Sequence, residues 1–211
     1  MDGVLKDKTM TTRKIRLAIM ASGKGSNAEA IIKFSLKKEA AFEVVVIITN
    51  NPDAGVIEIA KKYSVVWECI NFKSYINQSD ATSRLIETID KMKVEMIALA
   101  GYLQLIPEEL INKFPNRILN IHPSLLPKYG GKGMYGLRVH KKVIENREQI
   151  SGSSVHIVEN EYDSGKILCQ SRVKIEENEL PMTLSEKVLQ EEHIVYPLVL
   201  NEQSKQIISG L

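Results

Sequence analysis

The stretch that decides the fold is Arg117-Ile118-Leu119-Asn120-Ile121-His122-Pro123-Ser124-Leu125-Leu126-Pro127. Its apolar run from Ile118 to Ile121 lies between two prolines and predicts a short buried strand. Side chains two positions apart on a strand share a face, so Asn120 and His122 should lie side by side. In open α/β sheets, ligands bind where such strands end. The plainer alternative is that His122 only caps the strand end and that backbone groups satisfy its ring.

Around this stretch the chain alternates between strand patterns and helix patterns. Apolar and β-branched runs predict strands at residues 15–21, 42–49, 65–70, 96–100, 118–121, 153–158 and 166–173. Helical spacing predicts helices at residues 28–36, 54–63, 79–91, 108–113, 139–146 and 184–200, the last of them kinked or ended by Pro197. The alternation predicts an α/β fold with a mainly parallel, doubly wound (Rossmann-like) sheet. The last two strands should form a hairpin, which adds an antiparallel strand near the C-terminal part.

Composition and charge narrow the class of protein. The 211 residues are 44% hydrophobic and 26% charged, which is typical of a globular protein, and the net charge of +2 favours neither nucleic acid nor membrane as a partner. No apolar run approaches the ~18 residues of a membrane span, and no signal peptide is evident. Cys69 and Cys169 are interpreted as reduced core thiols, and a cytoplasmic location is expected. Residues 1–14 are expected to form a loose polar tail and residues 15–211 a single domain.

A glycine-rich turn follows the first predicted strand. In Ser22-Gly23-Lys24-Gly25-Ser26-Asn27, the glycines permit a close backbone approach, and Ser26 and Asn27 can cap the next helix. The amides and the positive dipole end of that helix would then face a phosphate group. The Walker spacing and the third glycine of the dinucleotide fingerprint are both missing, so a monophosphate fits better than ATP or NAD. The alternative is an ordinary tight strand-to-helix turn.

Three further segments are candidates for the site. The apolar loop from Gly101 to Pro107 can line a pocket for a flat ring or can belong to the core. The glycine-rich segment from Lys128 to Leu137 is either a surface loop or a lid. Asp163 follows a strand that carries His156, and both side chains could reach a site shared with His122. Glu192 by its pattern alone is an exposed helix acid.

Four motifs resemble a known family, the folate-dependent formyltransferases. They are Ser22–Asn27, Ala100-Gly101-Tyr102, the run from Asn120 to Tyr129, and Asp163-Ser164-Gly165. The resemblance runs in order from about Ile15 to Leu200. The first motif is similar to the branch of the family that acts on glycinamide ribonucleotide.

The resemblance implies roles for particular residues. Asn120, His122 and Asp163 would be catalytic, while Gly25, Ser26 and Asn27 would bind the substrate phosphate. Glu192 and Pro123 would contact the amine and ribose of the substrate, which replaces the surface interpretation of Glu192. The folate would be enclosed by Leu103, Gln104, Leu105, Ile106, Asn120, Asn160, Glu161, Tyr162 and Asp163.

Two departures from the family pattern stand out. Gln104 occupies a position where the family commonly has arginine, so a cation near the folate is missing there. The loop from Gly130 to Leu137 is several residues longer than in familiar members, and its role is open.

The activity implied is transfer of the formyl group of 10-formyltetrahydrofolate to the amine of glycinamide ribonucleotide in purine biosynthesis. In that reaction Asn120 and a protonated His122 would stabilise the oxyanion, and Asp163 would raise the pKa of His122. No metal is needed, and the protein would be a monomer or a homodimer. The alternatives are a formyltetrahydrofolate hydrolase, a transferase for another amine, and a non-catalytic nucleotide-binding module.

Overall fold

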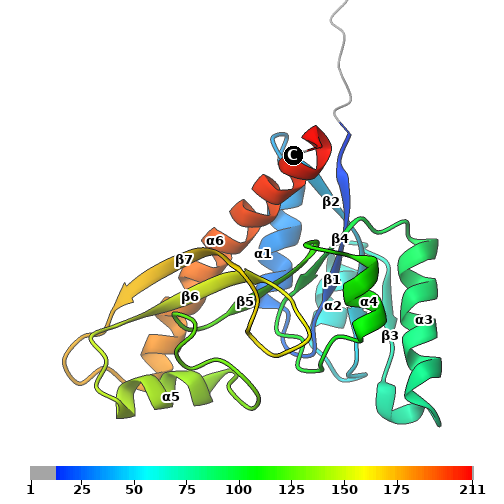
Figure 1. The fold of residues 1–211 in the computed structure, drawn as a ribbon. Helices are drawn as coiled ribbons and strands as arrows, with labels where there is room; N and C mark the ends of the chain where they lie inside the picture. Colours follow the sequence, from blue (N-terminus) through cyan, green and yellow to red (C-terminus); the bar gives the residue numbers. More distant parts are fainter. Residues whose placement is uncertain (1–12, 211) are drawn as a thin grey trace, which may run out of the picture.

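The apolar runs assemble into one mixed sheet with helices packed around it. The computed structural model describes residues 13–210, and its seven-stranded sheet has the order β3-β2-β1-β4-β5-β6-β7 (Figure 1). The strands are β1 (Ile15–Met20), β2 (Phe42–Thr49), β3 (Trp67–Cys69), β4 (Met96–Leu99), β5 (Ile118–His122), β6 (Ile150–Ile157) and β7 (Ile167–Lys174). The helices are α1 (Ser26–Ser35), α2 (Val56–Lys62), α3 (Gln78–Lys91), α4 (Glu108–Lys113), α5 (Leu137–Glu145) and α6 (Pro181–Ser209), with a 3-10 turn at Phe72–Ser74.

The strand directions confirm the predicted fold class. Every pairing among β1 to β5 is parallel, whereas β6 runs antiparallel to both β5 and β7. β6 and β7 form the predicted hairpin. The sheet is therefore mainly parallel, with its antiparallel strand in the C-terminal part of the chain.

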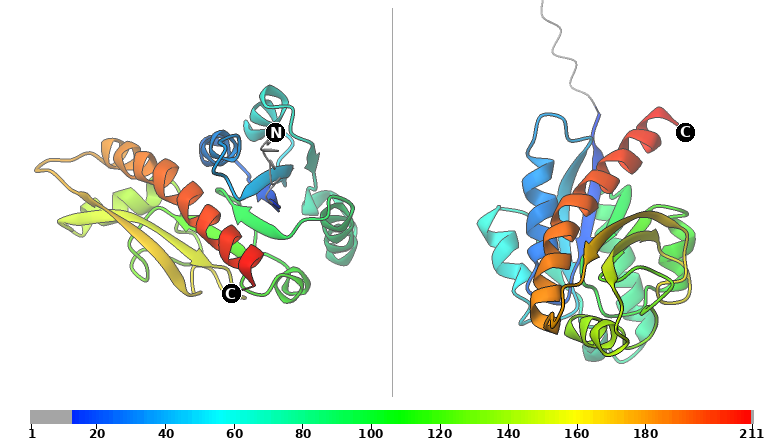
Figure 2. Two further views of the ribbon diagram at one scale, coloured as in Figure 1. Left: turned by 90° about the horizontal axis from the view of Figure 1, so that it is seen from above. Right: turned by 90° about the vertical axis from the view of Figure 1, so that its left-hand side faces the viewer.

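Helices cover both faces of the sheet, as Figure 2 shows. α1, α2 and α6 bury their apolar residues against one face, and α3 and α4 bury theirs against the other. In β1, Leu17 and Ile19 belong to the first core, whereas Ala18 and Met20 belong to the second. A strand that is covered on both faces needs apolar residues at every position, which explains the unbroken apolar runs.

The helix α6 does not end at Pro197, so of the two predicted effects of this proline the ending of the helix was wrong. The helix continues to Ser209 with Pro197 in its interior. Pro197 is buried, and its neighbours Tyr196 and Leu200 are fully buried in the core. The Tyr196 hydroxyl also lies 3.0 Å from the carbonyl oxygen of Leu99 and 2.9 Å from that of Leu119. This tertiary packing outweighs the cost of an internal proline, which is about 3 kcal/mol.

The order of the strands leaves a crevice at the carboxyl ends of β1 and β4. From β1 the chain proceeds outward through β2 and β3 and then returns to β4 on the other side of β1. The two loops that follow β1 and β4 are joined where the amide of Ser22 donates to the carbonyl of Gly101, at 3.1 Å, and the amide of Leu103 donates to the Ser22 hydroxyl, at 3.0 Å. Ligands bind at such switch points in open α/β sheets.

Two further expectations from the sequence were a loose N-terminal tail and the lack of a membrane-spanning segment. Most of the predicted loose tail lies outside the described residues, which begin at Arg13; Arg13 itself forms an ion pair with Glu95. Across residues 13–210, no helix combines the length and the apolar composition needed to cross a bilayer.

Candidate active site

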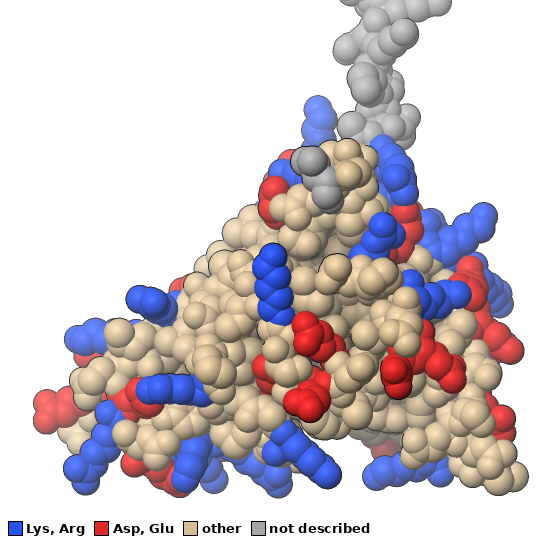
Figure 3. Space-filling model, viewed as in Figure 1, with Lys and Arg blue, Asp and Glu red and all other residues tan. Residues whose placement is uncertain are grey.

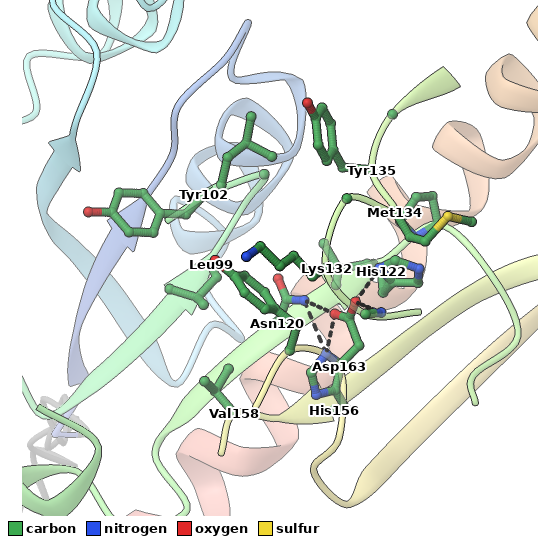
Figure 4. A pocket seen from close by; sticks show the side chains of 18 of the residues that line it. Leu99, Tyr102, Asn120, His122, Lys132, Met134, Tyr135, His156, Val158 and Asp163 are labelled. Carbon is green, nitrogen blue, oxygen red and sulfur yellow. Dashed lines mark hydrogen bonds and ion pairs between the residues drawn. The ribbon is translucent and has the colours of Figure 1, made fainter. Parts of the chain in front are cut away.

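A cavity of about 660 Å³ lies at the carboxyl ends of β4 and β5. Its wall is built from segments far apart in the sequence: the start of α1, the loop after β4, the end of β5, the glycine-rich loop before α5, the loop between β6 and β7, and α6. Figure 4 shows side chains from several of these segments directed into one space. The volume is in the range of pockets that hold small-molecule ligands.

Asn120, His122 and Asp163, the predicted catalytic set, meet in this cavity (Figure 4). The Asn120 amide nitrogen lies 3.3 Å from Oδ1 of Asp163, and Nδ1 of His122 lies 3.4 Å from Oδ2. His156 is the fourth member, because the antiparallel register places it directly opposite Asn120. Its Nε2 lies 3.0 Å from the Asn120 amide nitrogen and 3.5 Å from Oδ1 of Asp163. The sequence had indicated that His156 could reach this site, but not that it contacts Asn120.

Backbone carbonyls define which ring nitrogens carry protons. A carbonyl oxygen can only accept, so Nε2 of His122 donates to the carbonyl of Tyr129 at 2.7 Å, and Nδ1 of His156 donates to the carbonyl of Ile157 at 2.8 Å. Nε2 of His156 then faces both the Asn120 amide nitrogen, at 3.0 Å, and Oδ1 of Asp163, at 3.5 Å. The contacts with His156 and Asp163 orient the Asn120 amide.

Burial lowers the pKa of His122 below its usual range, although the charge of Asp163 and the Tyr129 carbonyl both act to raise it. The predicted effect of Asp163 is therefore present, but desolvation of the buried ring is larger, so the pKa of His122 falls overall. Burial alone would raise the pKa of Asp163. Hydrogen bonds and charges from His156, His122 and the amide of Gly131 outweigh it, so that pKa falls below its ordinary value. The carboxylate is thus held ionised beside two histidines.

The turn before α1 is built differently from the predicted cap. Gly25 is the N-cap residue, with φ +84°, and no side chain caps the helix, so the expectation that Ser26 and Asn27 cap it was wrong. A Cβ on Gly25 would lie 2.8 Å from Cα of Val56, so the glycine is required for packing as well as for its backbone angle. Of the three predicted phosphate ligands, Asn27 lines the cavity, whereas Gly25 and Ser26 are not among its lining residues.

Glu192 lies in the cavity wall and is not a surface acid. Its side chain is only 6% exposed, and Oε2 accepts a hydrogen bond of 2.6 Å from the Asn27 amide. Burial raises the pKa of Glu192 to about 7, while the bond from Asn27 acts to lower it. Oδ1 of Asn27 is buried and has no partner among the described residues, so this pair retains an unused acceptor. Pro123 lines the same cavity.

The predicted folate residues are brought together with one exception. Leu103, Gln104, Leu105 and Ile106 line the cavity on one side, and Glu161, Tyr162 and Asp163 line it on another. Asn160 is not among the residues that line this cavity and lies with Ile111 in a smaller depression, so its contact with folate stays a prediction. The Gln104 side chain accepts a hydrogen bond of 3.3 Å from Asn50.

His140 is a cavity residue that the sequence analysis did not single out. Its ring is buried in the wall and its Nδ1 has no partner within residues 13–210. Burial and the nearby His122 lower the pKa of His140 to about 4. The sequence could have indicated that His140 is buried, because it shares the inner face of α5 with Val139 and Val143. In the described part of the chain, no group of three or more His, Cys, Asp or Glu side chains is arranged to hold a metal ion.

Known proteins with similar sequences and structures support a family assignment. The formyl transferase family matches residues 15–200. Chloroplastic phosphoribosylglycinamide formyltransferase of Arabidopsis thaliana is 42% identical over 185 residues, which is 87% of this chain and 63% of that protein. The Bacillus subtilis phosphoribosylglycinamide formyltransferase is 33% identical over 187 residues, covering 89% of this chain and 93% of that one.

The fold comparison agrees with the sequence comparison. The crystal structure of glycinamide ribonucleotide transformylase 1 from Symbiobacterium toebii matches with a TM-score of 0.85 and 31% identity, over 91% of this chain and 88% of that one. The chain spans less than two thirds of the length of the plant relatives it matches, 63% and 60%. With the family match extending over nearly all of the described residues, the chain belongs to the formyl transferase family.

Proposed function

We propose that this chain is a phosphoribosylglycinamide formyltransferase of purine biosynthesis. It would transfer the formyl group of 10-formyltetrahydrofolate to the amine of glycinamide ribonucleotide. The observation that carries the proposal is the contact of Asn120 and His122 with Asp163 inside a cavity large enough for small-molecule ligands. The names of the Arabidopsis and Bacillus relatives support the same activity.

The reaction is an acyl transfer in which the donor supplies a formyl group bound to nitrogen. A bond forms from the acceptor amine to the formyl carbon, and the bond from that carbon to the donor nitrogen breaks. The amine loses one proton, and the departing nitrogen gains one. Asn120 and His122 are the donors for the negative charge that grows on the formyl oxygen.

In this scheme His122 and Asp163 transfer the protons. Because burial keeps the pKa of His122 low, the ring readily gives a proton to the departing nitrogen once it is charged. Asp163 favours the charged ring, and its own ionised state suits it to take up the proton that the amine loses. Asn120 reaches the formyl oxygen by exchanging one of its bonds to His156 and Asp163 for a bond to the substrate.

The acceptor would be held between α1 and α6. We assign its phosphate to the backbone of Gly25, Ser26 and Asn27, because the positive end of α1 points there and no side chain caps it. Glu192 and Pro123 would contact the ribose and the amine. Removing the phosphate from the acceptor should weaken its binding at least tenfold without affecting the donor, as measured by competition. Equal affinity for the phosphorylated and unphosphorylated acceptor would contradict the assignment.

The donor would lie against the loop after β4. Leu103, Leu105 and Tyr162 line the cavity and are partly exposed, and such apolar and aromatic groups suit a flat ring. Gln104 and Ile106 complete that side, and Asn120 and Glu161 supply polar contacts. The ring-binding side of the cavity is thus apolar with a few polar groups, as expected for a cofactor-sized ligand.

The deciding experiment is a formyl-transfer assay in which glycinamide ribonucleotide, other amines and water compete as acceptors. We expect formylated glycinamide ribonucleotide as the main product, and its loss in H122A. Formate as the main product would indicate a hydrolase, a different formylated amine would indicate another transferase, and binding without turnover would indicate a non-catalytic module.

We also propose that residues 15–211 act as one domain, as a monomer or homodimer, in the cytoplasm. Light scattering tests the oligomeric state, and cell fractionation tests the location.

A further inference from the structure

The cavity wall contains more acids than permanent cations. Within residues 13–210 its lysine and arginine side chains are Lys132 and Arg138, and both come from the glycine-rich segment that leads into α5. Its acids are Glu159, Glu161, Asp163 and Glu192. Figure 3 shows acidic side chains gathered over the loop that joins β6 to β7, on one side of the molecule. A wall of this kind repels anionic ligands unless Lys132 and Arg138 offset it.

The start of this segment is fixed on the catalytic cluster. The amide of Gly131 donates a 2.8 Å hydrogen bond to Oδ2 of Asp163. Gly130 is packed so closely that an added Cβ would lie 2.6 Å from Leu126 and 3.1 Å from Cβ of Asp163. Lys132 is the next residue, and its side chain is among those that line the cavity (Figure 4). The position of Lys132 is thus set by the same carboxylate that contacts His122.

The beginning of α5 places a second cation in the same wall. Arg138 lies in the first turn of α5, where the helix dipole disfavours a positive charge, and that turn has neither an acidic residue nor a side-chain cap. The guanidinium lies 4.9 Å from the centre of the Tyr135 ring. His140, two residues further along the helix, is buried in the cavity wall with Nδ1 unpartnered among the described residues. Uncapped amides, a cation and an unsatisfied ring nitrogen together favour an anionic ligand group here.

We infer that Lys132 and Arg138 bind the glutamate carboxylates of the folate donor. The inference rests on the proposed function, in which the acceptor's one phosphate is assigned to the start of α1. Among the anionic groups of the two substrates, the glutamate carboxylates of the donor then have no assigned binding residues. The loop after β4 offers them no charged side chain: its residues at the cavity are apolar apart from Tyr102 and Gln104, and Oε1 of Gln104 accepts a hydrogen bond from Asn50. The long glycine-rich loop therefore determines which folates bind well.

The test compares two donors on variants of the intact chain. The donors are 10-formyltetrahydrofolate and the same compound without its glutamate, 10-formyltetrahydropteroate. K132Q and R138Q should each raise the KM of the complete donor about tenfold, the size of one lost charge-assisted hydrogen bond, and leave the KM of the shortened donor unchanged. The matched control is K141Q, which removes an exposed charge from α5 outside the cavity wall. The KM of the acceptor and kcat should not change.

Other outcomes overturn the inference. A rise in the KM of the acceptor alone would assign the two cations to the phosphate, and an equal rise for both donors would show that the glutamate is not what they bind. No change in either variant would remove them from substrate binding. Calorimetric titration of tetrahydrofolate and tetrahydropteroate into the same variants gives the same comparison without turnover. If the chain binds folate through Lys132 but transfers no formyl group, the proposed function fails while this inference stands.

Discussion

Replacing Glu192 with glutamine should remove a pH dependence of stability that the unmodified protein carries. Burial raises the pKa of Glu192 from 4.5 to about 7. Below pH 4.5 the carboxyl is protonated in both the folded and the unfolded chain, and its contribution to the free energy of unfolding is fully present. Between pH 4.5 and 7 the folded chain keeps the proton while the unfolded chain loses it, so the free energy of unfolding falls as the pH rises.

The size of the effect follows from the shift. At about 1.4 kcal/mol per pH unit, a rise from 4.5 to about 7 corresponds to a loss of roughly 3 kcal/mol across that window. Glutamine keeps the shape and can keep a hydrogen bond with Asn27, but it does not ionise. The difference in the free energy of unfolding between the two proteins, wild type minus E192Q, should therefore decrease by roughly 3 kcal/mol between pH 4.5 and pH 8.

Urea unfolding at a series of pH values measures this difference. The matched control is E186Q, which removes an exposed carboxylate from the same helix and leaves the cavity intact. Curves of stability against pH that stay parallel for wild type and E192Q would refute the reasoning, because they would mean that Glu192 ionises equally in the folded and unfolded chain. If E186Q also lost the pH dependence of stability, the effect would come from charges on the surface of α6 and not from Glu192.

Three further predictions concern the same region. Asp163→Asn should lower the pKa of His122 further, because the anion that favours the charged ring is lost, and should reduce kcat by about 10²- to 10⁴-fold; an unchanged histidine titration by NMR would contradict this. Gly25→Ala should destabilise the protein by at least 1–2 kcal/mol through strain at φ +84° and overlap with α2, whereas Gly23→Ala, with open space around it, should be neutral; equal melting temperatures would contradict the packing argument. Tyr196→Phe should cost about 1 kcal/mol in urea unfolding through loss of the hydroxyl that contacts β4 and β5, and a stability equal to wild type would show that this contact is unimportant.

Much of the fold was predictable because the apolar patterns are local and strong. The β-branched run around Val46 has no polar residue to face solvent, which is typical of a strand covered on both faces. Asn120 and His122 share a face because side chains two positions apart on a strand always do. The hairpin of β6 and β7 followed from two alternating runs separated by a turn. These features depend on neighbouring residues and on little else.

The parts that could not be predicted depend on contacts between distant residues. The continuation of α6 through Pro197 depends on burial of Tyr196 against two strands, and the pKa of His122 depends on how deeply the fold buries its ring. The partnership of His156 with Asn120 depends on a strand register that no local pattern specifies. Glu192 has the pattern of a surface acid, and only the resemblance to a family indicated otherwise.

The hydrogen bond between Asn27 and Glu192 joins residues that are 165 positions apart, and it has a consequence for the timing of folding during synthesis. All seven strands leave the ribosome before α6, yet α6 supplies Ser185, Leu189 and Glu192 to the cavity wall. A nascent chain that already holds Asn120, His122 and Asp163 still lacks that wall. Such long-range closure is slow compared with local structure formation. The unfinished sheet therefore exposes an apolar face that needs protection from aggregation until α6 docks.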